Sequence, residues 1–94
     1  MSRTIRSIIQ NERTCLICGS SYTEVHHIFF GTSNRKVSDK NGFIAFLCPE
    51  HHRGNISPHH DRETDLRLKE LCQREYEKTH TRQEFIELIG KSYL

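Results

Sequence analysis

Two short cysteine and histidine motifs constrain the fold of this chain more than any other feature. They are Cys15-x-x-Cys18 and Cys48-x-x-His51, and 29 residues lie between them. Zn²⁺ prefers four tetrahedral nitrogen or sulfur ligands, and a gap of two residues lets one tight turn present two of them to the same ion. We therefore predict that the two turns, from distant parts of the chain, close one structural Cys₃His zinc site.

A structural metal ion would matter to a chain of this size. Only 34% of the 94 residues are apolar, and there is no Trp. Small domains with so little apolar material usually need a disulfide or a metal ion in addition to a core. Structural zinc contributes an apparent ~10–16 kcal/mol of folding free energy in small peptides. We expect the zinc ion to supply much of the stability.

Disulfide formation and redox chemistry are the alternatives to metal binding for the four cysteines. Disulfides would require an oxidising compartment, but residues 1–6 lead into no apolar signal segment. A redox CxxC pair would be expected in a βαβ context, which the pattern does not contain. No stretch approaches the roughly 20 apolar residues that span a membrane. We therefore expect a cytoplasmic protein without a membrane partner, whose cysteines bind metal except for Cys72, a small buried residue on a helix.

The distribution of apolar residues predicts an α+β fold in a single domain, 1–94. Its expected parts are an N-terminal arm (1–14), a knuckle-and-strand core (15–60) and C-terminal helices (61–94). Within the core, β-branched and aromatic residues predict a strand over 24–30, and a continuous apolar run predicts a buried strand over 43–47. The polar stretch from 31 to 42 is expected to be a loop, and Pro49 suits the first position of a short helix.

The last third of the chain has a helical pattern. Four apolar residues at i, i+3, i+4 and i+8 predict one amphipathic helix over roughly 62–79. These residues are Leu68, Leu71, Cys72 and Tyr76. A capping box formed by Thr81 and Glu84 predicts the start of a second helix, and Gly90 is placed to end it.

Histidines are concentrated in the middle of the chain. Six of the seven lie between residues 26 and 60, in three adjacent pairs: His26-His27, His51-His52 and His59-His60. A lone histidine is usually structural, but three pairs beside a predicted zinc knuckle point to metal or acid–base chemistry. The seventh, His80, lies between the two predicted helices and is expected to be solvated.

The order of these motifs resembles that of the HNH nucleases, also called His-Me finger or ββα-metal nucleases. The shared order is a CxxC pair, a strand that ends in a ligand–His pair, an apolar strand, and a CxxH pair followed at once by His. The resemblance implies a small zinc-stapled ββα-metal fold with C-terminal helices. It also implies that His26 and His52 bind a catalytic metal ion and that His27 is the general base. His59 and His60 are candidates for further ligands of that ion.

Three longer stretches resemble a narrower family, the phage and prophage recombination-enhancement, RecA-dependent nucleases. The stretches are EVHHIFFGTSNRK, LCPEHHRG and DLRLKELCQREYE, and the resemblance covers residues 14–94. It implies a metal-dependent endonuclease that hydrolyses DNA phosphodiester bonds during recombination. A RecA-type recombinase filament is the partner that it implies.

The chain departs from the HNH pattern at two positions. The first metal ligand is often Asp, and here it is His26. Phe43 stands where the family has its middle Asn, so Asn41 and Asn34 are the two candidates for holding the catalytic loop by hydrogen bonds. Neighbours on a regular strand face opposite sides of the sheet. His26 and His27 can therefore serve one phosphate only if the strand ends or distorts there.

The residue types suit phosphodiester hydrolysis. An imidazole with its ordinary pKa of about 6.5 is mostly neutral at cellular pH, so His27 could accept a proton from water. Imidazole ligands without a carboxylate favour Zn, Mn, Ni or Co as the catalytic divalent ion, with Mg less favoured. Glu24 or Glu50 could accept a hydrogen bond from a ligand and so fix its tautomer.

The charge distribution fits a nucleic-acid partner only weakly. Residues 1–60 carry seven Lys and Arg against four Asp and Glu, and residues 61–94 carry seven against eight. Arg35, Lys36 and Arg53 are the candidates for contacts with DNA phosphates. Two rival hypotheses stay open: a non-catalytic zinc module that binds DNA or protein, and a metal-storage or metal-sensing protein.

Overall fold

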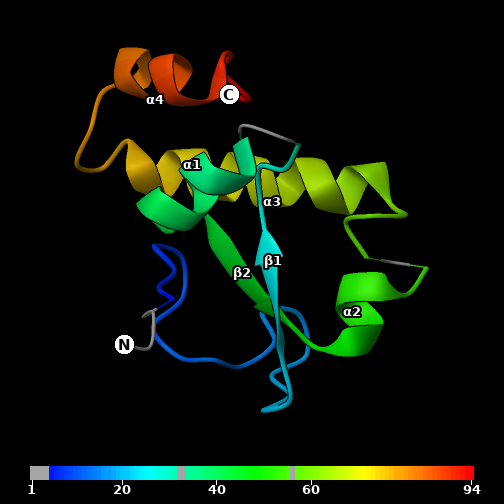
Figure 1. Cartoon of the computed structure of the whole chain (residues 1–94). Coiled ribbons are helices and arrows are strands. Elements are labelled where there is room, and N and C mark those ends of the chain that lie inside the picture. The colour runs from blue at the N-terminus through cyan, green and yellow to red at the C-terminus, as the bar shows by residue number, and fades with distance from the viewer. Residues whose placement is uncertain (1–4, 32–33, 56) are drawn as a thin grey trace.

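The computed structural model describes residues 5–31, 34–55 and 57–94. Within these ranges the chain forms two strands and four helices (Figure 1), in the order β1 (Glu24–His27), α1 (Asn34–Asn41), β2 (Ile44–Leu47), α2 (Pro49–Arg53), α3 (Arg62–Tyr76) and α4 (Arg82–Ile89). This is a small mixed α/β structure, which agrees with the predicted class. None of these helices is long and apolar enough to cross a membrane.

The two strands form one antiparallel sheet. The register pairs Glu24 with Leu47 and His27 with Ile44. All four residues of β2 are buried, which explains their continuous apolar run. In Figure 1, α1, α3 and α4 gather at one end of the sheet, whereas α2 and the loop before β1 lie toward the other end. The ligand motifs are therefore carried at the end of the sheet where β1 begins and β2 finishes.

β1 is shorter than the predicted strand 24–30. The N–H of Ile28 still donates to the Phe43 carbonyl at 2.9 Å. Gly31 then adopts a φ of 104°, a left-handed conformation that residues with a side chain rarely accept. The chain turns at this point, and His27 is left as the final residue of the strand.

A helix occupies most of the predicted loop between the strands, so that prediction was wrong. The cause is a tertiary contact made by α1. Ser38 is fully buried, and its hydroxyl accepts the N–H of Phe29 at 3.1 Å and donates to the carbonyl of Phe29 at 2.6 Å. Tertiary contacts of this kind stabilise helices whose sequence has no strong apolar stripe.

The C-terminal helices agree with the prediction in position, although α3 ends at Tyr76 rather than near residue 79. The hydroxyl of Thr81 accepts the N–H of Glu84 at 3.1 Å, and the N–H of Thr81 donates to the Glu84 carboxylate at 2.9 Å. These two bonds confirm the predicted capping box. Gly90 has a φ of 105° and ends α4, as predicted.

The buried side of α3 differs from the predicted stripe at one position. Cys72 is fully buried as predicted, but Leu71 is 40% exposed. Gln73 lies in the interior instead, because its side-chain oxygen accepts the N–H of Tyr93 at 2.7 Å and its amide donates to Ser92 at 2.9 Å. The buried amide therefore fastens the C-terminal segment to α3.

Aromatic rings form the centre of the core. The ring centroids of Phe29, Phe43 and Phe85 lie 5.4 to 6.0 Å apart. The N-terminal arm has neither helix nor strand in its described residues, 5–14, and it lies along β2. The side-chain oxygen of Gln10 accepts the N–H of Phe46 at 2.8 Å. The arm thus covers backbone groups that an edge strand would otherwise leave unpaired.

Candidate metal centres

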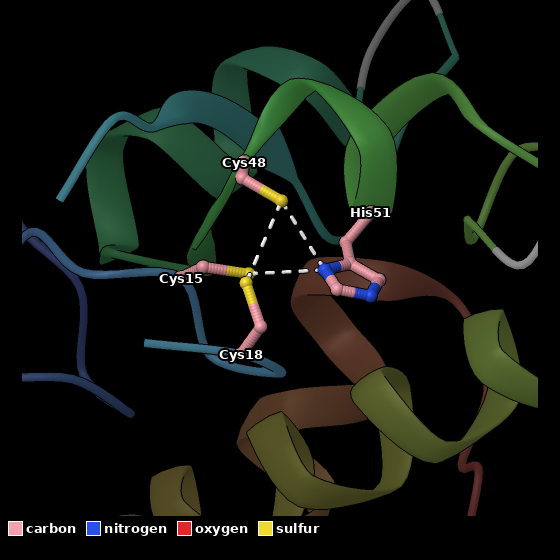
Figure 2. A group of neighbouring side chains, drawn as sticks. All are labelled: Cys15, Cys18, Cys48 and His51. Atoms are coloured by element: carbon pink, nitrogen blue, oxygen red, sulfur yellow. Dashed lines mark hydrogen bonds between the residues drawn. The ribbon is translucent and has the colours of Figure 1, made fainter. Parts of the chain in front are cut away.

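Four ligand atoms from two distant turns converge on one point (Figure 2). Cys15 and Cys18 belong to a turn before β1, in which the N–H of Gly19 donates to the Cys15 carbonyl at 2.8 Å. Cys48 is the N-cap residue of α2, and His51 lies within this helix. The three sulfur atoms and one imidazole nitrogen all lie within 4.8 Å of one another. This group could hold a metal ion such as zinc.

The distances within the group fit a tetrahedral ion. Zn–S bonds of about 2.3 Å and Zn–N bonds of about 2.0–2.1 Å place two sulfurs about 3.8 Å apart, and a sulfur and a nitrogen about 3.6 Å apart. The sulfurs of Cys18 and Cys48 are 3.7 Å apart. The Nδ1 of His51 lies 3.5 Å from the Cys15 sulfur and 3.2 Å from the Cys48 sulfur. The fold therefore brings the predicted Cys₃His set together, at distances that are compatible with a bound zinc ion.

The protonation of Cys15 also favours metal binding. Burial acts to raise the pKa of this thiol, but backbone hydrogen bonds at Cys48, Cys18 and Ile17 outweigh burial and lower the pKa to about 6. Cys15 is therefore largely a thiolate at neutral pH, which is the form that binds metal. None of the four cysteines forms a disulfide in the structure.

Three histidines form a second group. His26 comes from β1, His52 from α2, and His59 from the turn that precedes α3. Each offers one nitrogen, and the three nitrogens lie within 4.8 Å of one another. The Nε2 atoms of His52 and His59 are 3.4 Å apart, which is about the spacing of two nitrogens on one tetrahedral ion. This histidine cluster (His26, His52 and His59) could also hold a metal ion.

His26 is the buried member of the histidine cluster. Its side chain is 1% exposed, and among the described residues its Nε2 has no hydrogen-bond partner. A buried polar atom without a partner costs free energy, and an ion bound at the cluster would remove that cost. Burial, assisted by the neighbouring imidazoles, lowers the pKa of His26 to about 3. His26 is therefore neutral at pH 7, as a metal ligand must be.

Glu24 orients the second member. Its Oε1 lies 2.7 Å from the Nδ1 of His52, so this nitrogen donates its proton to the carboxylate and Nε2 keeps its lone pair for an ion. The bond from His52 is also the main cause that lowers the pKa of Glu24. The guanidinium of Arg53 donates to the other carboxylate oxygen at 2.5 Å. Of the two acidic candidates, Glu24 makes the contact, whereas Glu50 is exposed on α2.

His27 lies beside the histidine cluster without belonging to it. It lines a pocket of about 570 Å³ together with all three members of the cluster. Its Nε2 is 3.8 Å from Oδ1 of Asp39 on α1, too far for a hydrogen bond but close enough for the carboxylate to stabilise a protonated imidazole. The neighbouring histidines His26 and His27 both line this pocket. Sequence reasoning missed Asp39, which lies in the stretch expected to be a loop.

His60 and His80 belong to neither ligand group. His60 is exposed and is not part of the group, although its neighbour His59 is. Of the two candidate ligands in the turn between α2 and α3, only His59 lies in the histidine cluster. His80 is exposed but not merely solvated, because its ring stacks on that of Tyr76 with the centroids 4.1 Å apart.

The predicted basic residues lie near the pocket in different settings. Arg35, on α1, is one of the residues that line it. Lys36 follows on the same helix and is exposed. Arg53 is 67% exposed in its side chain and is already bound to Glu24. Arg35 is therefore the basic residue best placed to meet a ligand in the pocket.

Ser38 holds the segment after β1, and the candidate Asn41 is used elsewhere. The amide of Asn41 donates to the carbonyl of Val37 within its own helix, at 2.9 Å, so it does not hold the segment. Asn34 begins α1. The two hydrogen bonds between Ser38 and Phe29 perform the holding instead. One serine in a polar stretch carries no signal that sequence reasoning could have used.

A comparison of the chain with protein-family models, curated proteins and solved structures finds no significant match. Function must therefore be inferred from the residues themselves. The two ligand groups and the pocket beside them are the features that carry such an inference.

Proposed function

We propose that this protein is a metal-dependent endonuclease of the HNH class that hydrolyses DNA phosphodiester bonds. The observation that carries the proposal is the pocket in which His27 lies beside three histidines able to hold one ion. A module that only bound DNA or protein would have use for the Cys₃His group. It would have no use for a second group of imidazoles that opens onto the same pocket as a further histidine.

The two groups would serve different ends. The Cys₃His group offers four ligands, which fill a tetrahedral zinc ion and leave no open position, as in structural sites. The histidine cluster offers three, which leaves room for a phosphate oxygen. A divalent ion held there would supply Lewis-acid stabilisation of the charge that develops on the phosphate.

The residues around the histidine cluster would accept a proton, orient a metal ligand and bind the phosphate. His27 would accept the proton of the attacking water, and the carboxylate of Asp39 at 3.8 Å would stabilise the imidazolium that results. Glu24 would keep His52 in the tautomer that presents Nε2. Arg35 would bind a non-bridging phosphate oxygen, without reading the sequence of the DNA.

The proposal is tested by cleavage of plasmid and single-stranded DNA across divalent metals, with and without a RecA-type filament. Replacing His27 with Ala should lower the rate by roughly 10²- to 10⁴-fold, the usual contribution of a general base. Zinc content and circular dichroism should not change. His60→Ala is the matched control, because it removes an exposed histidine outside the histidine cluster and should leave the rate as it is.

Two results would contradict the proposal. One is cleavage by the His27→Ala protein at the rate of the unaltered protein. The other is the absence of cleavage under every metal and filament condition, which would favour the non-catalytic zinc module.

A further inference from the structure

Phe30 is the phenylalanine that the protein does not bury. The other four, Phe29, Phe43, Phe46 and Phe85, are at most 3% exposed, whereas Phe30 is 45% exposed. A single exposed apolar side chain usually needs no explanation. This one lines the same pocket as the histidine cluster, which makes its exposure relevant to whatever the pocket binds.

The ring of Phe30 lies within reach of a ligand bound at the cluster. Its centroid is 6.3 Å from the ring of His26 and 5.8 Å from the ring of His59. A phosphate held at the cluster would carry its sugar and base outward from these imidazoles. The base of the adjoining nucleotide could then lie against the exposed part of the phenyl ring.

A buried cation holds this ring in place from one side. The ammonium of Lys69 lies over the Phe30 ring, 4.7 Å from its centroid, and is bound to the carboxylate of Asp65 at 2.7 Å. The side chain of Lys69 is only 12% exposed, so the ring face beneath it is turned into the protein. Phe30 also lines the pocket, and 45% of the residue is exposed. An aromatic ring fixed in this way loses little conformational freedom when a ligand stacks on it.

The pocket beside Phe30 places the exposed ring near a basic residue. A side chain built on Gly31 would meet no atom of the described residues within 4 Å. Arg35 lines the same pocket, and its backbone N–H donates to the Gly31 carbonyl at 3.2 Å. An exposed aromatic ring beside a cation is the combination by which proteins bind single strands without reading their sequence.

We propose that Phe30 stacks on an unpaired base next to the scissile phosphate, and that the substrate class is therefore single-stranded or locally unpaired nucleic acid. The inference rests on the proposed function, because it places the reacting phosphate at the histidine cluster. A base within a regular duplex has both faces covered by its neighbours. A base has to leave that stack before it can lie on the ring of Phe30.

Binding measurements can isolate this contact. The probes are a fluorescent thymidine 12-mer, an abasic 12-mer with the same phosphates, and a 12-base-pair duplex. Fluorescence anisotropy would be recorded on the zinc-loaded protein in a His27→Ala background, so that the strand stays intact. Phe30→Leu removes the aromatic face but keeps an apolar side chain, and Phe30→Trp restores an aromatic face. Leu71→Ala is the matched control, since it removes an exposed apolar residue outside the pocket.

Phe30→Leu should weaken binding of the thymidine strand by roughly 5- to 150-fold, the usual range for loss of one base–aromatic stack. Binding of the abasic strand and of the duplex should change by less than about 2-fold, because these probes offer no free base to stack. Phe30→Trp and Leu71→Ala should bind the thymidine strand as the background protein does. Unchanged thymidine binding in Phe30→Leu would overturn the inference, and so would an equal loss for the abasic strand or the duplex.

The outcomes separate this inference from the proposed function. If the protein cleaves DNA and Phe30→Leu binds all probes normally, the nuclease stands and the stacking contact is refuted. If the thymidine preference depends on Phe30 but no cleavage is found, the stacking contact stands and the nuclease is refuted. If the protein binds none of the three probes, the stacking contact is refuted, and the cleavage assay alone decides the nuclease.

Discussion

His51 and His52 are neighbours on α2 and belong to two different ligand groups. The Nδ1 of His51 lies 3.2 Å from the Cys48 sulfur, among the thiols. The Nε2 of His52 lies 3.4 Å from that of His59, and its Nδ1 lies 2.7 Å from Glu24. A helix of five residues thus links the two groups. A metal ion that anchors α2 through His51 would therefore also position His52 in the histidine cluster.

Loss of zinc should therefore weaken metal binding at the histidine cluster. Cys18→Ser removes the exposed thiol of the Cys₃His group and should lower zinc affinity. Once α2 is no longer anchored, we expect the affinity of the histidine cluster for Mn²⁺ to fall by roughly 10-fold or more, the effect of losing a contact that orients a ligand. Isothermal titration calorimetry with Mn²⁺ measures it. Unchanged Mn²⁺ affinity in a zinc-depleted protein would show that the two groups are independent.

Cys72 should remain an unreactive thiol. Its side chain is fully buried, and this burial raises its pKa far above the usual range. Thiol reagents attack the thiolate, so Cys72 should stay unmodified in the folded, zinc-loaded protein and react once urea unfolds the chain. Mass spectrometry of the labelled peptides distinguishes the two states. Cys72→Ala should still bind one zinc ion per chain, and fast labelling of the folded protein would contradict the assignment.

Glu24 should govern metal affinity through His52. Glu24→Ala removes the acceptor at 2.7 Å from Nδ1, so we expect a 10- to 100-fold loss of affinity for the ion at the histidine cluster. Glu24→Gln keeps an acceptor oxygen and should lose less. Glu50→Ala, which changes an exposed carboxylate on α2, serves as the control. Metal titrations that fail to distinguish Glu24→Ala from Glu50→Ala would refute the positioning effect.

The histidine cluster should prefer transition metals to magnesium. Its three ligands are all imidazoles, whereas Mg²⁺ prefers oxygen ligands and near-octahedral geometry. Cleavage rates in metal-depleted protein should be much higher with Mn²⁺, Ni²⁺ or Co²⁺ than with Mg²⁺ at the same concentration. Rates with Mg²⁺ that equal or exceed those with Mn²⁺ would contradict the ligand set.

The parts of the fold that depend on neighbouring residues could be predicted from sequence. The capping box of Thr81 and Glu84 and the end of α4 at Gly90 require only a few consecutive residues, and both are confirmed. The turn at Cys15 and the start of α2 at Pro49 are local in the same sense. Each of these features depends on residues that are close together in the sequence.

The parts that depend on distant contacts could not be predicted. α1 forms because Ser38 binds Phe29, and Gln73 is buried because the C-terminal segment supplies its partners. Likewise, the sequence makes His59 and His60 equally good candidates for a metal ligand. In the structure, the turn before α3 places only His59 in the histidine cluster. These features depend on contacts between residues that are distant in the sequence, and a single sequence does not show which distant residues meet.

The central claim is that α2 carries ligands for two ions of different chemistry. Anomalous diffraction at the zinc and manganese edges, from crystals of the zinc-loaded protein soaked in Mn²⁺, tests it directly. We expect one zinc peak among Cys15, Cys18, Cys48 and His51, and a separate manganese peak among His26, His52 and His59. Density for zinc alone, with no manganese between the three imidazoles, would contradict the account.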